Sequence, residues 1–135
     1  MIIKRLTMHN FGVYASTNTF EFSGKKPIVL IGGLNGRGKT TFLEAVLLSL
    51  YGANSFAYKE SSFNTYGQYL RSFVNVSDGT KETYVELEFV LNNADRDHHI
   101  IRRDWSAVNK VRTIEEIRVQ KNGSYNAFLT ENWLM

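Results

Sequence analysis

The glycine-rich run from Gly33 to Thr41 constrains the fold of this chain more than any other segment. It fills the pattern G-x-x-x-x-G-K-[ST], with the fixed positions at Gly33, Gly38, Lys39 and Thr40. In this pattern backbone N–H groups curl around a di- or triphosphate, and the lysine reaches the outer phosphates. The mechanism requires a strand before the loop and a helix after it. The sequence therefore predicts a strand–loop–helix unit of the P-loop type.

The residues on either side of the loop supply both elements. Residues 28–31, Ile-Val-Leu-Ile, predict a short buried strand. Residues 40–51 predict a helix whose apolar side chains surround most of its surface, which indicates burial between layers. Gly52 stands where the helix is expected to end. A glycine-rich surface turn is the alternative interpretation, but turns seldom need the four glycines found within residues 32–38.

Each position of the loop has an expected role. Backbone donors are expected at Gly33, Asn35, Gly36, Arg37 and Gly38. Lys39 is expected to pair with the β- and γ-phosphates, and the Thr40 hydroxyl to coordinate Mg²⁺. Thr41 and the positive end of the helix dipole would add further favourable interactions near the phosphates. The predicted ligand is a nucleoside triphosphate with Mg²⁺.

The chain does not supply a complete site for hydrolysis. A nucleoside triphosphatase needs an acidic residue at the end of a second apolar strand and a group that positions the attacking water. The nearest apolar runs end at Asn92, or are followed by Arg102 and Arg103 before Asp104. No catalytic residue is therefore assigned. The two arginines could meet a phosphate or a partner domain, although a solvated strand end is the simpler interpretation.

Length and composition narrow the class of protein. At 135 residues the chain has the length of one domain and is short for a complete nucleotide hydrolase. Its 16 Lys+Arg against 13 Asp+Glu permit contact with nucleic acid without arguing for it. Without cysteine the chain forms no disulfide, cysteine-ligated zinc site or iron–sulfur cluster. Charge follows directly after Ile3 and no long apolar run is present, so we expect no membrane contact and a cytoplasmic protein.

The remaining segments predict an α/β lobe in which antiparallel hairpins flank the phosphate-loop core. Residues 2–11 and 19–22 suit two strands joined by a polar turn at 15–18. Residues 84–89 and 98–105 suit a second pair, and residues 114–120 and 125–129 suit a third pair across an Asn-Gly turn. Residues 53–64 are expected to form a loop, and a helix is expected to open at 130–132.

Aromatic residues recur at helical spacing at Tyr66, Tyr69 and Phe73, with Leu70 on the same face. Aromatic side chains near Arg71 could stack on bases. The spacing is also what a short helix needs to bury one face. We therefore expect a helix that packs on the core.

The loop and its helix also carry a resemblance to a known family. The string from Asn35 to Val46, NGRGKTTFLEAV, resembles the N-G-x-G-K-[ST]-[ST]-x-x-[ED]-A-[IV] motif of ABC-type DNA-repair and chromosome ATPases. This group includes the structural-maintenance-of-chromosomes (SMC) proteins, the double-strand-break repair ATPases and the recombination proteins F and N. The first strand, which closes in Asn10 and Phe11, resembles the opening strand of the family. Residues 28–52, with Leu-Tyr-Gly closing the helix, are most similar to the ATPases of bacterial DNA sulfur modification, which places phosphorothioates in DNA.

The resemblance implies that residues 1–135 form the N-terminal lobe of an ABC-type ATPase head, ahead of its glutamine loop, coiled coil and C-terminal lobe. It implies ATP and Mg²⁺ as cofactors. It also implies as partners the chain's own C-terminal lobe, a second head, DNA and other sulfur-modification proteins, in a bacterial cytoplasm. Asn10 and Phe11 would lie at the edge that holds ribose or base. Many relatives carry a nucleotide-contacting arginine directly after this pair, whereas this chain has Gly12, so the resemblance is weaker at this corner.

Three other functions remain open at this stage. The lobe could belong to another SMC-like DNA repair or recombination ATPase. A small-molecule kinase would also use a phosphate loop, but it would need an arginine-rich lid, and the flanking hairpins argue against it. The chain could also act as an interaction platform that binds nucleotide poorly without its second lobe.

Overall fold

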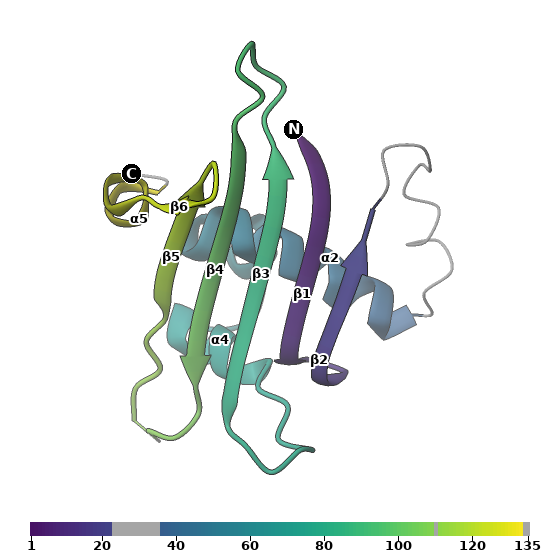
Figure 1. Ribbon diagram of the computed structural model, residues 1–135. Coiled ribbons are helices and arrows are strands. Elements are labelled where there is room, and N and C mark those ends of the chain that lie inside the picture. Colours follow the sequence, from purple (N-terminus) through teal and green to yellow (C-terminus); the bar gives the residue numbers. More distant parts are fainter. Residues whose placement is uncertain (23–35, 110, 134–135) are drawn as a thin grey trace.

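The protein is built on one six-stranded antiparallel sheet, seen in a computed structural model that describes residues 1–22, 36–109 and 111–133. The strand order is β2-β1-β3-β4-β5-β6 (Figure 1). The strands are β1 (Ile2–Phe11), β2 (Tyr14–Glu21), β3 (Glu82–Val90), β4 (His98–Ser106), β5 (Glu116–Lys121) and β6 (Ser124–Tyr125). The predicted hairpins are present, and they join edge to edge into a continuous sheet.

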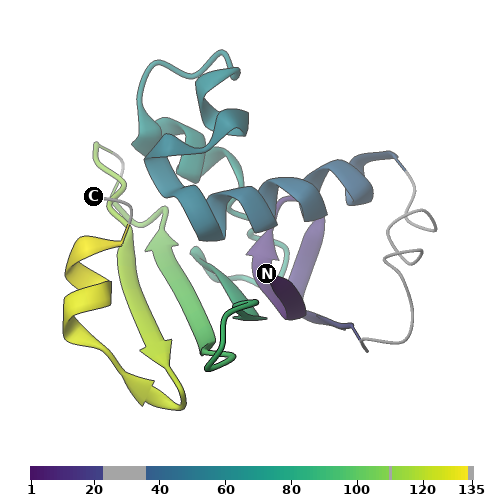
Figure 2. The ribbon, with the colours of Figure 1, turned by 90° about the horizontal axis from the view of Figure 1, so that it is seen from above.

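Helices cover one face of this sheet. The long helix α2 (Gly36–Tyr51) runs across the strands, and α4 (Tyr66–Ser72) lies on the same side (Figures 1 and 2). Two short elements, η1 (Gly52–Asn54) and α3 (Phe56–Lys59), connect them, and α5 (Ala127–Asn132) lies beside β5. The protein is thus an α/β structure with a helical layer on a sheet, as the sequence predicts.

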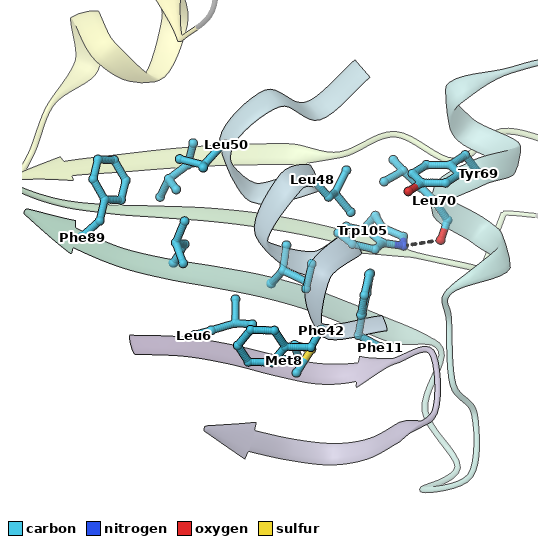
Figure 3. Packing of buried hydrophobic residues seen from close by; sticks show 14 of the residues in the cluster. Leu6, Met8, Phe11, Phe42, Leu48, Leu50, Tyr69, Leu70, Phe89 and Trp105 are labelled. Atoms are coloured by element: carbon cyan, nitrogen blue, oxygen red, sulfur yellow. Dashed lines mark hydrogen bonds between the residues drawn. The ribbon is translucent and has the colours of Figure 1, made fainter. Parts of the chain in front are cut away.

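The core lies between α2 and the sheet face that it covers (Figure 3). Alternate residues of β3, Val85, Leu87 and Phe89, are buried, which confirms the half-buried strand predicted for residues 84–89. They meet the buried side of α2, formed by Phe42, Ala45 and Leu48. Burial of this apolar surface is what holds the helix on the sheet.

The short aromatic helix contributes to the same core. Tyr69 and Leu70 of α4 are buried, and the indole N–H of Trp105 donates to the carbonyl of Leu70 at 2.8 Å (Figure 3). The Thr65 side chain caps the helix by accepting a hydrogen bond from the N–H of Gln68. Core packing, and not base stacking, therefore explains the aromatic spacing.

The first hairpin turns earlier than predicted. Its turn lies at Gly12 and Val13, and residues 15–18 belong to β2, so the prediction of a turn at 15–18 is wrong. Asn10 and Gly12 have φ angles of +50° and +59°, in the left-handed region that asparagine and glycine tolerate best. The polar residues of β2 suit its place at the edge of the described sheet, where their side chains are largely exposed.

Other boundaries also differ from expectation. Helix α2 begins at Gly36 rather than at residue 40, although Gly52, with φ +54°, ends it as predicted. The expected loop at 53–64 contains η1 and α3. The strand expected at 125–129 is wrong beyond Tyr125, because Asn126 caps α5 by accepting from the N–H of Leu129 at 2.9 Å. The strand expected at 28–31 lies outside the described residues.

Candidate phosphate-binding site

The first turn of α2 is the described part of the predicted phosphate loop. Of the eight predicted binding residues, Gly33 and Asn35 lie outside the described residues, and only the backbone of Gly36, Arg37 and Lys39 is described. The first four N–H groups of a helix have no intrahelical acceptor, and the positive end of the dipole lies beside them. The chain therefore presents helix donors at the position where the motif requires them, and the binding role of these residues stays a prediction.

The two threonines that follow the lysine point in different directions. Thr40 is exposed, whereas Thr41 is only 8% exposed. Thr41 lies against the β1–β2 turn, because a Cβ atom at Gly12 would come within 2.6 Å of its Cγ2. Seating of Mg²⁺ on the Thr40 hydroxyl is compatible with this exposure and stays a prediction.

The first residue of β2 also contacts the start of α2 through its side chain. The Tyr14 hydroxyl donates to the main-chain carbonyl of Gly38 at 2.9 Å. This contact was not predicted, since no pattern in the sequence links a tyrosine to a carbonyl 24 residues later. The β1–β2 hairpin therefore touches the start of α2 at Gly38, through Tyr14, and at Thr41, through Gly12.

Asn10 and Phe11, the predicted base or ribose edge, are both fully buried. The Asn10 amide donates to Asp78 at 2.8 Å and to Thr80 at 3.0 Å, and its oxygen accepts from the N–H of Ser16 at 2.6 Å. The hydrogen bond from Asn10 lowers the pKa of Asp78.

The Phe11 ring is enclosed in the same corner. It stacks on Phe73 with ring centres 4.4 Å apart and meets Trp105 edge-on at 6.0 Å. Both side chains of the corner thus fix the β1–β2 turn from inside the domain. Their contact with a nucleotide stays a prediction.

The far end of α2 is held by Arg103, whose prediction as a solvated strand end is wrong. Its side chain is 5% exposed, donates to the carbonyl of Ser49 at 3.1 Å and pairs with Glu115 at 2.7 Å. The Tyr66 hydroxyl donates to the other oxygen of Glu115 at 2.7 Å, and burial followed by the charge of Glu115 raises the pKa of Tyr66. Gly52 leaves the space that the guanidinium occupies, since a Cβ there would lie 2.6 Å from Nη1.

The neighbouring Arg102 lies on the opposite face of β4. It pairs with Asp104 at 2.9 Å and its guanidinium lies 3.8 Å from the centre of the Tyr84 ring. The alternation of His99, Ile101, Arg103 and Trp105 on the buried side of β4 is the pattern that could have identified Arg103 as an internal residue.

Gly12→Ala should destabilise the protein by about 2–4 kcal/mol, because it adds left-handed backbone strain to a clash with Thr41. Urea unfolding measures the loss. Gly79→Ala is the matched control: its φ is +87°, but nothing lies within 4 Å of the added Cβ, so only about 1–2 kcal/mol of strain is expected. Adding Thr41→Ser, which removes Cγ2, should recover part of the Gly12→Ala loss, and no recovery would contradict the proposed clash.

In the part of the chain that the structure describes, no helix is both long and apolar enough to cross a membrane. The His, Asp and Glu side chains of these described residues form no group of three or more that could hold a metal ion.

Comparison with known proteins identifies the family. Residues 5–134 match the family model described as an AAA domain. The chain is 46% identical over 48 residues to the SbcC component of the nuclease SbcCD of Treponema pallidum. It is 33% identical over 102 residues to the DNA double-strand break repair Rad50 ATPase of Methanocaldococcus jannaschii, and 28% identical over 115 residues to that of Nanoarchaeum equitans. These alignments cover 36%, 76% and 85% of the chain, and only 5%, 8% and 12% of the relatives.

A solved structure has the same fold. The SMC head domain from Thermotoga maritima superposes with a TM-score of 0.53 at 17% identity, covering 98% of this chain and 41% of that one. At this identity the likeness concerns the fold alone. The chain belongs to the AAA domain family and has the fold of part of an SMC head domain.

Proposed function

We propose that this lobe binds ATP and Mg²⁺ at the start of α2 and belongs to a DNA-processing ATPase. The residue types in the first turn of α2 support the binding of ATP. The first turn of α2 contains Arg37 and Lys39 and no acidic residue. Basic residues at the positive end of a helix dipole are unfavourable unless an anion lies there. A polyphosphate would turn this repulsion into attraction.

Different groups at the start of α2 would bind different parts of the ligand. Backbone N–H groups of the first turn would donate to phosphate oxygens, and Lys39 would neutralise the outer phosphates. The Thr40 hydroxyl would hold Mg²⁺, which usually keeps several waters and takes few protein ligands. ATP supplies the transferable γ-phosphate, and this lobe supplies its binding and orientation.

Hydrolysis would need residues from other parts of a longer protein. The chain spans about a tenth of the length of its curated relatives. Asp104, the acid nearest to an apolar run, is held by Arg102 on the face of the described sheet opposite α2. We propose that a C-terminal lobe and a second head complete the site, and that ATP-driven closure of the two heads acts on DNA.

A small-molecule kinase is disfavoured by the way in which three arginines of the described residues are held. Such an enzyme needs mobile arginines that close over the transferred phosphate. Arg71 donates to the carbonyls of Ala107 and Asn109. Arg102 and Arg103 are paired with carboxylates of the same lobe. These contacts hold the three side chains within the lobe, so they are not free to close over a substrate.

Two DNA-processing roles can be separated. The curated relatives named above favour double-strand-break repair as the first candidate. The second is phosphorothioate modification, which rests on the likeness of residues 28–52, closed by Leu50-Tyr51-Gly52, to sulfur-modification ATPases. In that case the partners would be other sulfur-modification proteins.

Deletion of the gene in the source organism should lower survival after ionising radiation and leave DNA phosphorothioate content unchanged. Colony counts measure survival, and mass spectrometry of digested DNA measures phosphorothioates. Wild-type protein should restore survival, whereas Lys39→Ala should not. Normal survival together with loss of phosphorothioates would replace repair by sulfur modification, and no change in either would contradict both roles.

A further inference from the structure

We propose that Tyr14 is a positioning residue for the phosphate loop, holding the carbonyl of Gly38 so that the next N–H, at Lys39, is aimed toward the phosphates. The proposal rests on the nucleotide-binding role proposed above. It assigns that role to a side chain outside the G-x-x-x-x-G-K-[ST] motif. Tyr14 would fix the geometry of the loop and would not contact the nucleotide.

The tyrosine acts on the peptide unit between residues 38 and 39. The Tyr14 hydroxyl lies 2.9 Å from the Gly38 carbonyl oxygen. Because a trans peptide is planar, the Lys39 N–H points away from that carbonyl. This N–H lies in the first turn of α2, at the positive end of the helix dipole. A hydrogen bond that fixes the carbonyl therefore also fixes the direction of the Lys39 N–H.

Aromatic contacts hold the tyrosine ring in place. The ring of Tyr14 meets Phe20 edge-on at 5.8 Å, and Phe20 meets Phe42 edge-on at 5.3 Å. Phe42 lies in α2 and is 2% exposed. Burial raises the pKa of Tyr14, so its hydroxyl remains a protonated donor at neutral pH. The ring thus links the β1–β2 hairpin to the helix that it positions.

The backbone that carries Tyr14 is also fixed. The N–H of Gly12 donates to the carbonyl of Phe73 at 2.7 Å, and the Asn75 amide donates to the carbonyl of Gly12 at 2.9 Å. At the other end of the contact, a Cβ on Gly38 would lie only 3.1 Å from the Tyr14 hydroxyl oxygen. A glycine at position 38 therefore leaves the room that the hydroxyl needs.

Tyr14→Phe in the full-length natural protein tests the proposal. It removes one hydrogen bond and keeps the ring, so the Kd for Mg-ATP should rise about threefold to tenfold. Isothermal titration calorimetry measures the Kd. Tyr66→Phe is the matched control, because it removes a hydroxyl that bonds Glu115 near the other end of α2. It should lower the unfolding temperature and leave the Kd unchanged.

The outcomes separate this proposal from the proposed function. If wild type binds Mg-ATP, Lys39→Ala does not, and Tyr14→Phe binds as wild type does, the positioning role is overturned and the nucleotide site stands. Wild type without binding would overturn the nucleotide site itself. Equal losses in Tyr14→Phe and Tyr66→Phe would show a general structural effect and overturn the positioning role.

A second variant covers the case in which Tyr14→Phe does not fold. 4-Aminophenylalanine at position 14 keeps an N–H donor in the place of the hydroxyl. Its Kd should stay within about twofold of the wild-type value, because the hydrogen bond to Gly38 is retained. A tenfold loss with the donor present would overturn the proposal.

Discussion

Replacing Lys39 by alanine should raise the Kd for Mg-ATP at least about 100-fold, because the side chain would make two charge-assisted hydrogen bonds of about 1.5–3 kcal/mol each to the outer phosphates. The fold should be unchanged. Helix α2 is held on the sheet by its buried residues Phe42, Ala45 and Leu48, and none of them depends on the charge at position 39. Calorimetric titration measures the affinity, and circular dichroism checks the fold.

Lys59→Ala is the matched control for this change. It also removes one lysine from a helix, but Lys59 is exposed in α3 and lies outside the motif. Its Kd should equal that of wild type. An unchanged Kd for Lys39→Ala would refute the assignment of the phosphate loop, and equal losses in both variants would indicate a nonspecific effect of net charge.

Arg103→Met should destabilise the protein by about 3–5 kcal/mol, the usual cost of leaving a buried charge without its partner. Methionine keeps the apolar stem, so the loss comes from the guanidinium. Glu115 would lose its 2.7 Å ion pair, and the carbonyl of Ser49 would lose a donor. Urea unfolding followed by tryptophan fluorescence measures the effect.

Arg102→Met gives the control on the same strand. Arg102 is also paired with a carboxylate, but its side chain is 32% exposed against 5% for Arg103, so a loss below about 1 kcal/mol is expected. Adding Glu115→Gln to Arg103→Met should recover part of the loss, since it removes the stranded charge. Equal losses in the two arginine variants would contradict a special role for the buried pair.

Much of the fold follows from local pattern. The alternation in residues 84–89 predicts β3 because every second side chain must enter the core, and the spacing from Tyr66 to Phe73 predicts α4 for the same reason. Gly52 marks the end of α2 because glycine adopts its φ of +54° with little strain. These features depend on neighbours within one element, so the sequence displays them.

The features that could not be predicted depend on distant partners. The first hairpin turns at Gly12 because Phe73 and Asn75 bind its backbone, and neither contact leaves a mark in the sequence of the hairpin. Arg103 is internal because Ser49 and Glu115 come to it from other elements. Predictions from local hydrophilicity are therefore wrong for the first turn and for Arg103.

The candidate site shows the same division. The eight predicted binding residues come from the spacing of the motif alone, because phosphate binding by main-chain groups demands a particular order of glycines, and their role stays a prediction. Tyr14 acts on a main-chain carbonyl, which every residue possesses. The residue type at position 38 therefore does not indicate that Tyr14 binds there. The supporting contacts of a site are thus harder to predict than its motif.

Helix α2 is fastened near both ends. Tyr14 holds Gly38 at its start, while Arg103 and the Trp133 indole, at 3.1 and 2.8 Å, hold the carbonyls of Ser49 and Leu50 at its end. These hydrogen bonds oppose any sliding of α2 along its own axis against the strands beneath it. If the proposed nucleotide binds at the start of α2, we therefore expect helix and sheet to move together, as a rotation of the whole lobe.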